Sequence, residues 1–299
     1  MTKRLPLLLL GGIACWALSS CKTPQQAFYA SPVNGYSNQY NPLPQLIDSS
    51  HTAFYAGATF YSGSANSGGK DYQNTFIGSF TVAHHTDKFQ AWYGGDLFLG
   101  SYHMGRWDTS KYNTTPSQST VAFDQDILNS YSSAHSFGSV GFHGGADYVM
   151  PITKGEWRVI GIEGSLNHDF GSYYNIRKNL PDSAASIIAR GPNYGTLGIS
   201  SELIGSTAHG EFGFRMATGW ALGAPYRNSG VYDYKREKYV AYGYFSMTTH
   251  FTHDRFTLFG QLQFATKADG ISFGMAYRLN KPRTAPPSLP HRRKALLGN

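Results

Sequence analysis

Alternation of apolar and polar positions dominates most of this chain. In the stretch HGEFGFRMATGW, which ends at Trp220, Phe212 and Phe214 share the parity of that tryptophan. Glu211 and Arg215 fall on the other parity, among small residues. Because a strand points successive side chains to opposite faces, one face of this segment is aromatic and the other is small and charged. The period of two therefore predicts a β-strand here.

Ten segments of about ten residues alternate in the same way. They span residues 52–62, 74–84, 88–101, 135–150, 156–171, 194–204, 208–222, 238–252, 255–266 and 270–280. Along the chain, short connections between these segments mostly alternate with long ones. The short ones, rich in turn-forming residues, are 85–87, 151–155, 205–206 and 253–254, while all but the last of the others are long. Consecutive segments are therefore expected to form antiparallel hairpins.

This layout resembles that of bacterial outer-membrane β-barrels, which have short periplasmic turns and longer extracellular loops. We therefore expect an all-β fold over residues 51–280: an antiparallel up-and-down transmembrane β-barrel of about ten strands, with eight possible. The segment 270–280 resembles the closing strand of such barrels, although a further tail follows it here. A soluble lipocalin-like lipoprotein with its apolar faces turned inward is the alternative fold.

The N-terminus adds a membrane anchor to this picture. Lys3 and Arg4 precede an apolar run, residues 7–16, that is too short to span a membrane. The following Leu18-Ser19-Ser20-Cys21 resembles the lipobox of bacterial lipoproteins, which implies removal of residues 1–20 as a signal peptide. Cys21 would then carry a covalent lipid, and no other cofactor is expected.

The residues after Cys21 indicate which leaflet this lipid enters. Lys22-Thr23-Pro24 lack the acidic run that marks surface export of lipoproteins in Bacteroidota. We therefore expect a lipid in the inner leaflet and, since the strand number is even, both termini in the periplasm of a Gram-negative cell. Residues 21–50, rich in Pro, Asn, Gln and Tyr, then form an extended tether that lies across the barrel mouth or on a neighbouring protein.

The net charge of +7 comes from the two ends of the chain. The signal peptide holds two of the basic residues, and the Pro-rich tail, residues 281–299, holds five and no acid. Residues 51–280 are close to neutral, which gives no reason to expect a nucleic-acid partner. In the tail, the residues expected to bind an acidic partner, anionic headgroups or the cell wall are Arg283, Arg292, Arg293 and Lys294. A solvated end without a partner is the alternative.

If the apolar faces meet lipid, the opposite faces line a narrow lumen and collect charge. The expected lumenal residues are Asp96, His143, Asp147, Glu163, Glu202, Glu211, Arg215 and Arg278. Arg or Lys on the lipid face costs about 2–4 kcal/mol at mid-bilayer, which favours this inward assignment. We expect a paired network, with Glu163 a candidate partner for Arg215. Arg158 breaks the parity and is expected to reach the headgroups from outside.

These observations favour a non-catalytic outer-membrane barrel lipoprotein, a structural or accessory subunit of a larger assembly, secretion or uptake complex. One alternative is a small pore or solute-binding barrel. Another is an outer-membrane hydrolase or acyltransferase built around His168 and Asp169, although adjacent strand residues point to opposite faces. No metal site is expected, and His84, His85 and His253 are assigned to the periplasmic rim.

Overall fold

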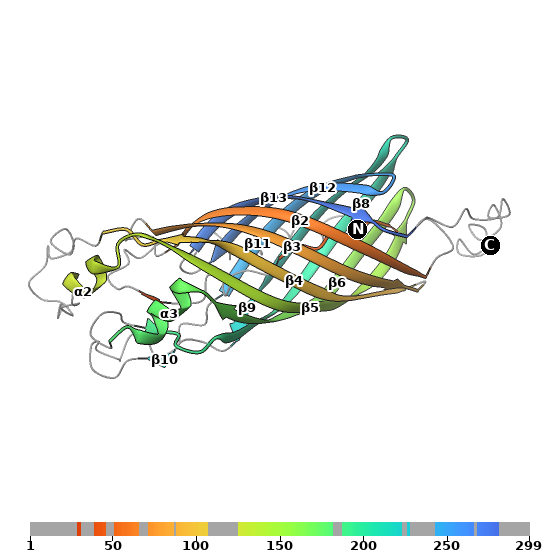
Figure 1. Ribbon diagram of the computed structural model, residues 1–299. Coiled ribbons are helices and arrows are strands. Elements are labelled where there is room, and N and C mark those ends of the chain that lie inside the picture. The colour runs from red at the N-terminus through yellow and green to blue at the C-terminus, as the bar shows by residue number, and fades with distance from the viewer. Residues whose placement is uncertain are drawn as a thin grey trace, which may run out of the picture.

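The computed structural model contains a closed barrel of ten strands (Figure 1). It describes residues 29–30, 39–45, 51–65, 71–86, 88–106, 125–181, 187–222, 226–227, 243–265 and 268–280. The barrel strands are β2 (Thr52–Ala65), β3 (Asp71–His85), β4 (Phe89–His103), β5 (Ala134–Ile152), β6 (Gly155–Phe170), β8 (Asn193–Thr207), β9 (Gly210–Leu222), β11 (Gly243–His253), β12 (Phe256–Ala265) and β13 (Ala268–Arg278). Neighbours pair antiparallel, and β13 pairs with β2 to close the barrel. The expected ten-stranded all-β barrel is confirmed.

Several expectations fall outside the described residues. They concern the signal peptide 1–20, the lipidated Cys21, and the basic tail with Arg283, Arg292, Arg293 and Lys294.

The two ends of the barrel differ in their connections. At one end, which we call the short-turn end, two-residue turns join β5 to β6, β8 to β9 and β11 to β12. At the other, the long-loop end, the connections include α2 (Gln125–Ser130), α3 (Ser172–Asn179), β7 (Ile187–Ile188) and β10 (Tyr226–Arg227). None of the helices in the described part is long and apolar enough to cross a membrane.

The outer surface of the barrel is apolar. Phe142, Leu166 and Phe273 are exposed by 77%, 69% and 60% on strands whose alternate residues are buried. Aromatic pairs such as Phe89 and Tyr148, with ring centroids 5.4 Å apart, lie near the short-turn end. Such an exterior suits acyl chains with an interfacial aromatic girdle and excludes the lipocalin-like alternative, whose apolar faces would point inward.

One strand departs from the simple alternation. Between Arg158 and Gly161, the pairing of β6 with β8 shifts by one residue at a β-bulge. A one-residue shift moves side chains to the opposite face. Arg158 is therefore turned into the barrel and is 2% exposed, although Ile160 on the same sequence parity lies outside. The expectation that Arg158 reaches the headgroups is wrong.

The described parts of residues 29–45, which we call the N-terminal arm, lie at two places: residues 39–45 in the lumen and residues 29–30 at the long-loop end. Residues 39–45 make their contacts with inward-facing side chains of the barrel. β1 (Tyr29–Ala30) pairs in parallel with β7, which pairs with β10, and both belong to long connections. The sequence predicted a tether across the barrel mouth or on a neighbouring protein, whereas residues 39–45 lie inside the barrel and Tyr29–Ala30 lie at the long-loop end.

Candidate functional site

All of the expected lumenal residues lie inside the barrel, and each is less than a tenth exposed. They are Asp96, His143, Asp147, Glu163, Glu202, Glu211, Arg215 and Arg278. Arg278 belongs to the short-turn end, where its Nε donates to Oδ1 of Asn280 at 3.4 Å. The others come from β4, β5, β6, β8 and β9. They surround a segment without secondary structure, residues 39–45, which the alternation of the sequence does not predict.

We call the segment Gln39–Gln45 the plug segment. It contains no strand, yet residues 40–44 are buried. Burying irregular backbone is costly when its N–H groups find no partners. Pro42 and Pro44 carry no N–H group, so the sequence NPLPQ lowers that cost. The extended, proline-rich composition expected of a tether also suits a strand-free segment inside a barrel.

Glu202 of β8 is the centre of the plug contacts. One carboxylate oxygen accepts a hydrogen bond from the hydroxyl of Tyr40 at 2.7 Å and lies 3.1 Å from Nε2 of His250. The other accepts from Nη1 of Arg158 at 2.6 Å. A buried carboxylate is stable only when it is paired and hydrogen-bonded, and here Tyr40 and Arg158 do this.

Arg158 joins the plug segment to two acids. Its guanidinium donates to Glu156 at 2.7 and 3.0 Å, to Glu202, and to the backbone carbonyl of Leu43. Leu43 itself packs in an apolar cluster with Trp92 and small residues of β2 and β3. Arg158 cannot be recognised as a lumenal residue from the alternation, because only the bulge turns it inward.

Arg215 and Glu211, from one strand, serve different partners. Arg215 of β9 pairs with Glu163 of β6, on the far side of β8, which is the partner expected from the sequence. Its guanidinium lies 5.3 Å from the ring centroid of Tyr40. Glu211 accepts the backbone N–H of Gln45 at 3.1 Å. The two charges therefore act as separate supports, and each contacts the plug segment.

Thr81, His143 and Asp96 are arranged like the nucleophile, base and acid of a catalytic triad. Nδ1 of His143 lies 2.6 Å from Asp96, and its Nε2 lies 3.0 Å from the hydroxyl of Thr81. That hydroxyl donates to Oδ1 of Asn41 in the plug segment at 3.3 Å. All four side chains are buried. The arrangement acts as an anchor for Asn41.

The proposed His168–Asp169 pair is not assembled. His168 is exposed on the outer wall, and its Nδ1 lies 2.7 Å from Oδ1 of Asn193. Asp169 points inward and pairs with Arg177 of α3 at 2.7 Å. Because the two side chains lie on opposite faces, they cannot act together on one substrate.

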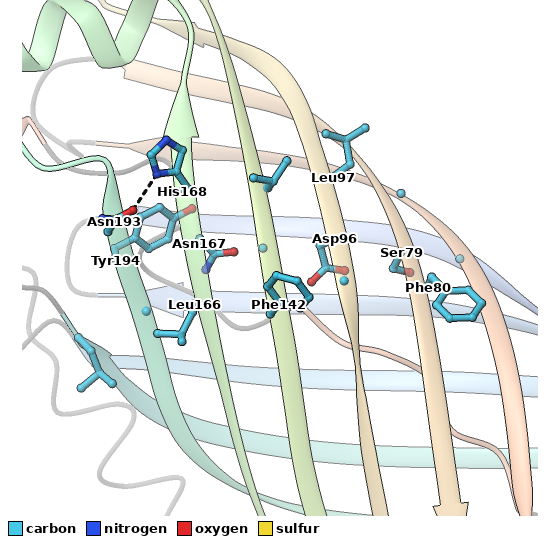
Figure 2. Close-up of a pocket in the computed structure, with 17 residues that line it drawn as sticks. Ser79, Phe80, Asp96, Leu97, Phe142, Leu166, Asn167, His168, Asn193 and Tyr194 are labelled. Atoms are coloured by element: carbon cyan, nitrogen blue, oxygen red, sulfur yellow. Dashed lines mark hydrogen bonds between the residues drawn. The ribbon is translucent and has the colours of Figure 1, made fainter.

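A hollow of about 1010 Å³ lies along the barrel wall from β2 to β9 (Figure 2). Its apolar lining includes Phe80, Phe142 and Leu166, all exposed. Outward-facing Gly78 deepens it, since a Cβ there would meet nothing within 4 Å. Asp96 also borders the hollow, but its carboxylate is held by His143. The hollow therefore offers a surface for acyl chains and no exposed acid.

Metal binding has no support in the described part of the chain. There, no group of three His, Cys, Asp or Glu side chains is placed to hold a metal ion. His84 and His253 lie near the short-turn end, at the ends of β3 and β11. His84 stacks on Tyr93 with ring centroids 5.7 Å apart, and Nδ1 of His253 lies 2.8 Å from the carbonyl oxygen of His209.

Comparison with known proteins gives barrels of similar type. No protein-family model and no curated protein matches the chain. Among solved structures, an outer-membrane channel from Pseudomonas putida F1 is similar at 10% identity and a TM-score of 0.35, over 83% of this chain and 99% of that one. Neisserial surface protein A is similar at 11% identity and a TM-score of 0.31, over 77% and 98%. The β domain of the Bordetella autotransporter BrkA is similar at 8% and 0.37, over 77% and 99%. At these values the matches bear on neither site nor activity, and the architecture follows from the strand pairing.

Proposed function

We propose that this chain is a bacterial outer-membrane lipoprotein whose barrel is a closed, non-catalytic scaffold. The observation that carries this proposal is the plug segment, bonded through Tyr40 and Gln45 to Glu202 and Glu211. Eight strands enclose a lumen that side chains alone can fill, and ten strands leave a little more room. The plug segment occupies that room, which favours a closed barrel over an open channel.

The role that fits a closed barrel best is that of an accessory subunit in a larger outer-membrane complex. The apolar exterior holds the barrel in the membrane, and Cys21 would add a lipid. In the orientation usual for such barrels, the short-turn end faces the periplasm. β13 ends there, so the tail with Arg283, Arg292, Arg293 and Lys294 begins on the periplasmic side and can bind an acidic partner.

Planar-bilayer recording tests the closed lumen. We expect the full-length protein to be silent across ions and voltages, and a variant lacking residues 39–45 to conduct once heat-modifiable gel mobility shows that it is folded. A matched control deletes seven residues of the tail, 293–299, and should remain silent. Steady conductance of the full-length protein would contradict the proposal.

Gentle detergent extraction after cross-linking tests the accessory role. We expect the protein to migrate in a complex larger than the monomer. Replacing Arg292, Arg293 and Lys294 by Gln should release it if the tail binds an acidic partner. A free monomer in both preparations would exclude this role while leaving the closed barrel intact.

A gated pore is the second candidate. It is favoured by the way the plug segment is held: through side-chain and single backbone hydrogen bonds rather than a strand ladder. Such a segment can leave the lumen without breaking the wall. Conductance of the full-length protein that appears only under a voltage or a solute, and is abolished by cross-linking the plug to the wall, would favour the pore.

A further inference from the structure

Two parts of the N-terminal arm lie at different heights in the barrel. β1 belongs to the small sheet with β7 and β10 at the long-loop end. Gln39, only nine residues after Ala30, donates from its side chain to Oγ1 of Thr59, which faces the lumen halfway along β2. The residues between these two points are not among those described.

The length of the connecting chain decides its route. Nine residue steps reach at most about 30–32 Å. From Thr59 up the lumen to the long-loop end is about 15 Å along the barrel axis, given six tilted residues at about 3.3 Å each. Leaving through the short-turn end and returning outside requires about 50 Å on the same basis. It would also place unpaired backbone in lipid. Only the route through the lumen is short enough for nine residue steps.

We infer that the N-terminal arm threads the barrel, so that Cys21 and the lipid proposed for it lie on the long-loop side, in the outer leaflet. Cys21 precedes Tyr29 by eight residues, a reach of at most about 26–29 Å. Fourteen tilted residues of β2 span about 33 Å along the axis, and the lumen already holds the plug segment. The lipid therefore cannot return to the inner leaflet.

This placement reverses the leaflet expected from the residues after Cys21. The missing acidic run argues against one export route for lipoproteins, but a threaded arm does not depend on that route. The barrel carries its own N-terminus across the membrane, with the polar lumen shielding the backbone from lipid. The threading rests on the strand pairing and the plug contacts, and only the lipid rests on the proposed function.

Epitope accessibility on intact cells tests the threading with the full-length protein. One tag is inserted between Thr23 and Pro24, and a second version carries the same tag after Asn299. We expect antibody to label the N-terminal tag on intact cells and the C-terminal tag only after the outer membrane is permeabilised. Two tags that behave alike, or a C-terminal tag that alone is accessible, would overturn the inference.

A second measurement does not depend on the tags. Cysteines at Tyr29 and Ile187, which pair in register, should be joined by a membrane-impermeant thiol cross-linker on intact cells. Failure to join in a folded protein would also overturn the threading. Radiolabelled fatty acid incorporation, compared with Cys21→Ala, examines the lipid separately. An unlabelled protein with an accessible N-terminal tag would refute the lipoprotein proposal and leave the threading intact.

Discussion

At the scale of single residues, the lumen is organised by the neutralisation of buried charge. Glu202 is bonded by Tyr40 and Arg158 and approached by His250, while Glu163 is paired with Arg215. Because charges inside the barrel are costly unless they are partnered, the loss of one partner should be felt throughout this network.

Tyr40→Phe tests the bond between the plug and the wall. Removing the hydroxyl takes one donor from a buried carboxylate, and hydrogen bonds to charged groups contribute about 1.5–3 kcal/mol. We expect the free energy of unfolding in urea to fall by about that amount. Tyr72→Phe, at a ring on the outer face, is the matched control and should change it by less than about 0.5 kcal/mol. Equal effects of the two substitutions would refute the assigned role of Tyr40.

Arg158→Met tests the inward orientation of the arginine. The substitution leaves Glu156 and Glu202 without their guanidinium partner, at a cost of about 3–5 kcal/mol. Combining it with Glu156→Gln and Glu202→Gln should restore most of the stability, because the uncompensated charges are then gone. An arginine on the lipid face would give the opposite result, with Arg158→Met neutral or stabilising in urea unfolding.

At the scale of elements, inward-facing glycines make room for large side chains on neighbouring strands. A Cβ on Gly213 of β9 would lie 1.8 Å from Nε2 of His250 on β11. That nitrogen is the atom that approaches Glu202. The glycine is therefore part of what places the histidine at the centre of the network.

Gly213→Ala should displace His250 and destabilise the barrel by about 1–3 kcal/mol, the usual cost of overpacking. Gly78→Ala is the control, since it adds the same methyl group to a strand at an outward position with open space. Urea unfolding of the two variants, with heat-modifiable mobility as a check of folding, gives the comparison. A neutral Gly213→Ala would contradict the packing described for His250.

Alternation predicted the ten strands and the inward side of the network because both follow from local period-two patterning. Arg158 was misplaced because a bulge depends on the pairing of β6 with its neighbours and leaves no mark in the local pattern. The plug segment was missed for a related reason: residues 39–45 show no periodicity, and their place is decided by long-range contacts with Glu202 and Glu211. Their prolines were a visible signal, but one shared with any extended tether.

At the scale of the whole molecule, a single layer of strands separates an apolar exterior from an interior lined with polar and charged side chains. The exterior suits the hydrocarbon of a membrane, and the buried residues 40–44, which precede the first barrel strand, take up part of the interior. A protein of this form holds a fixed position and a fixed shape, which suits a subunit of a larger assembly. Its N-terminal arm links the two ends of the barrel.

The most direct test of the central claim, that the plug segment lies against the inner wall of the barrel, is cross-linking of the two. Cysteines replace Asn41 and Thr81, whose side-chain oxygens lie 3.3 Å apart, and a short thiol cross-linker is applied to the folded protein in membranes. A control pair replaces Asn41 and Phe80, which faces the outside on the same strand. Mass spectrometry of the digest should show joined peptides for Asn41 with Thr81 and none for the control. Absence of the first product from folded protein, or equal yields from both pairs, would contradict a plug segment held inside the lumen.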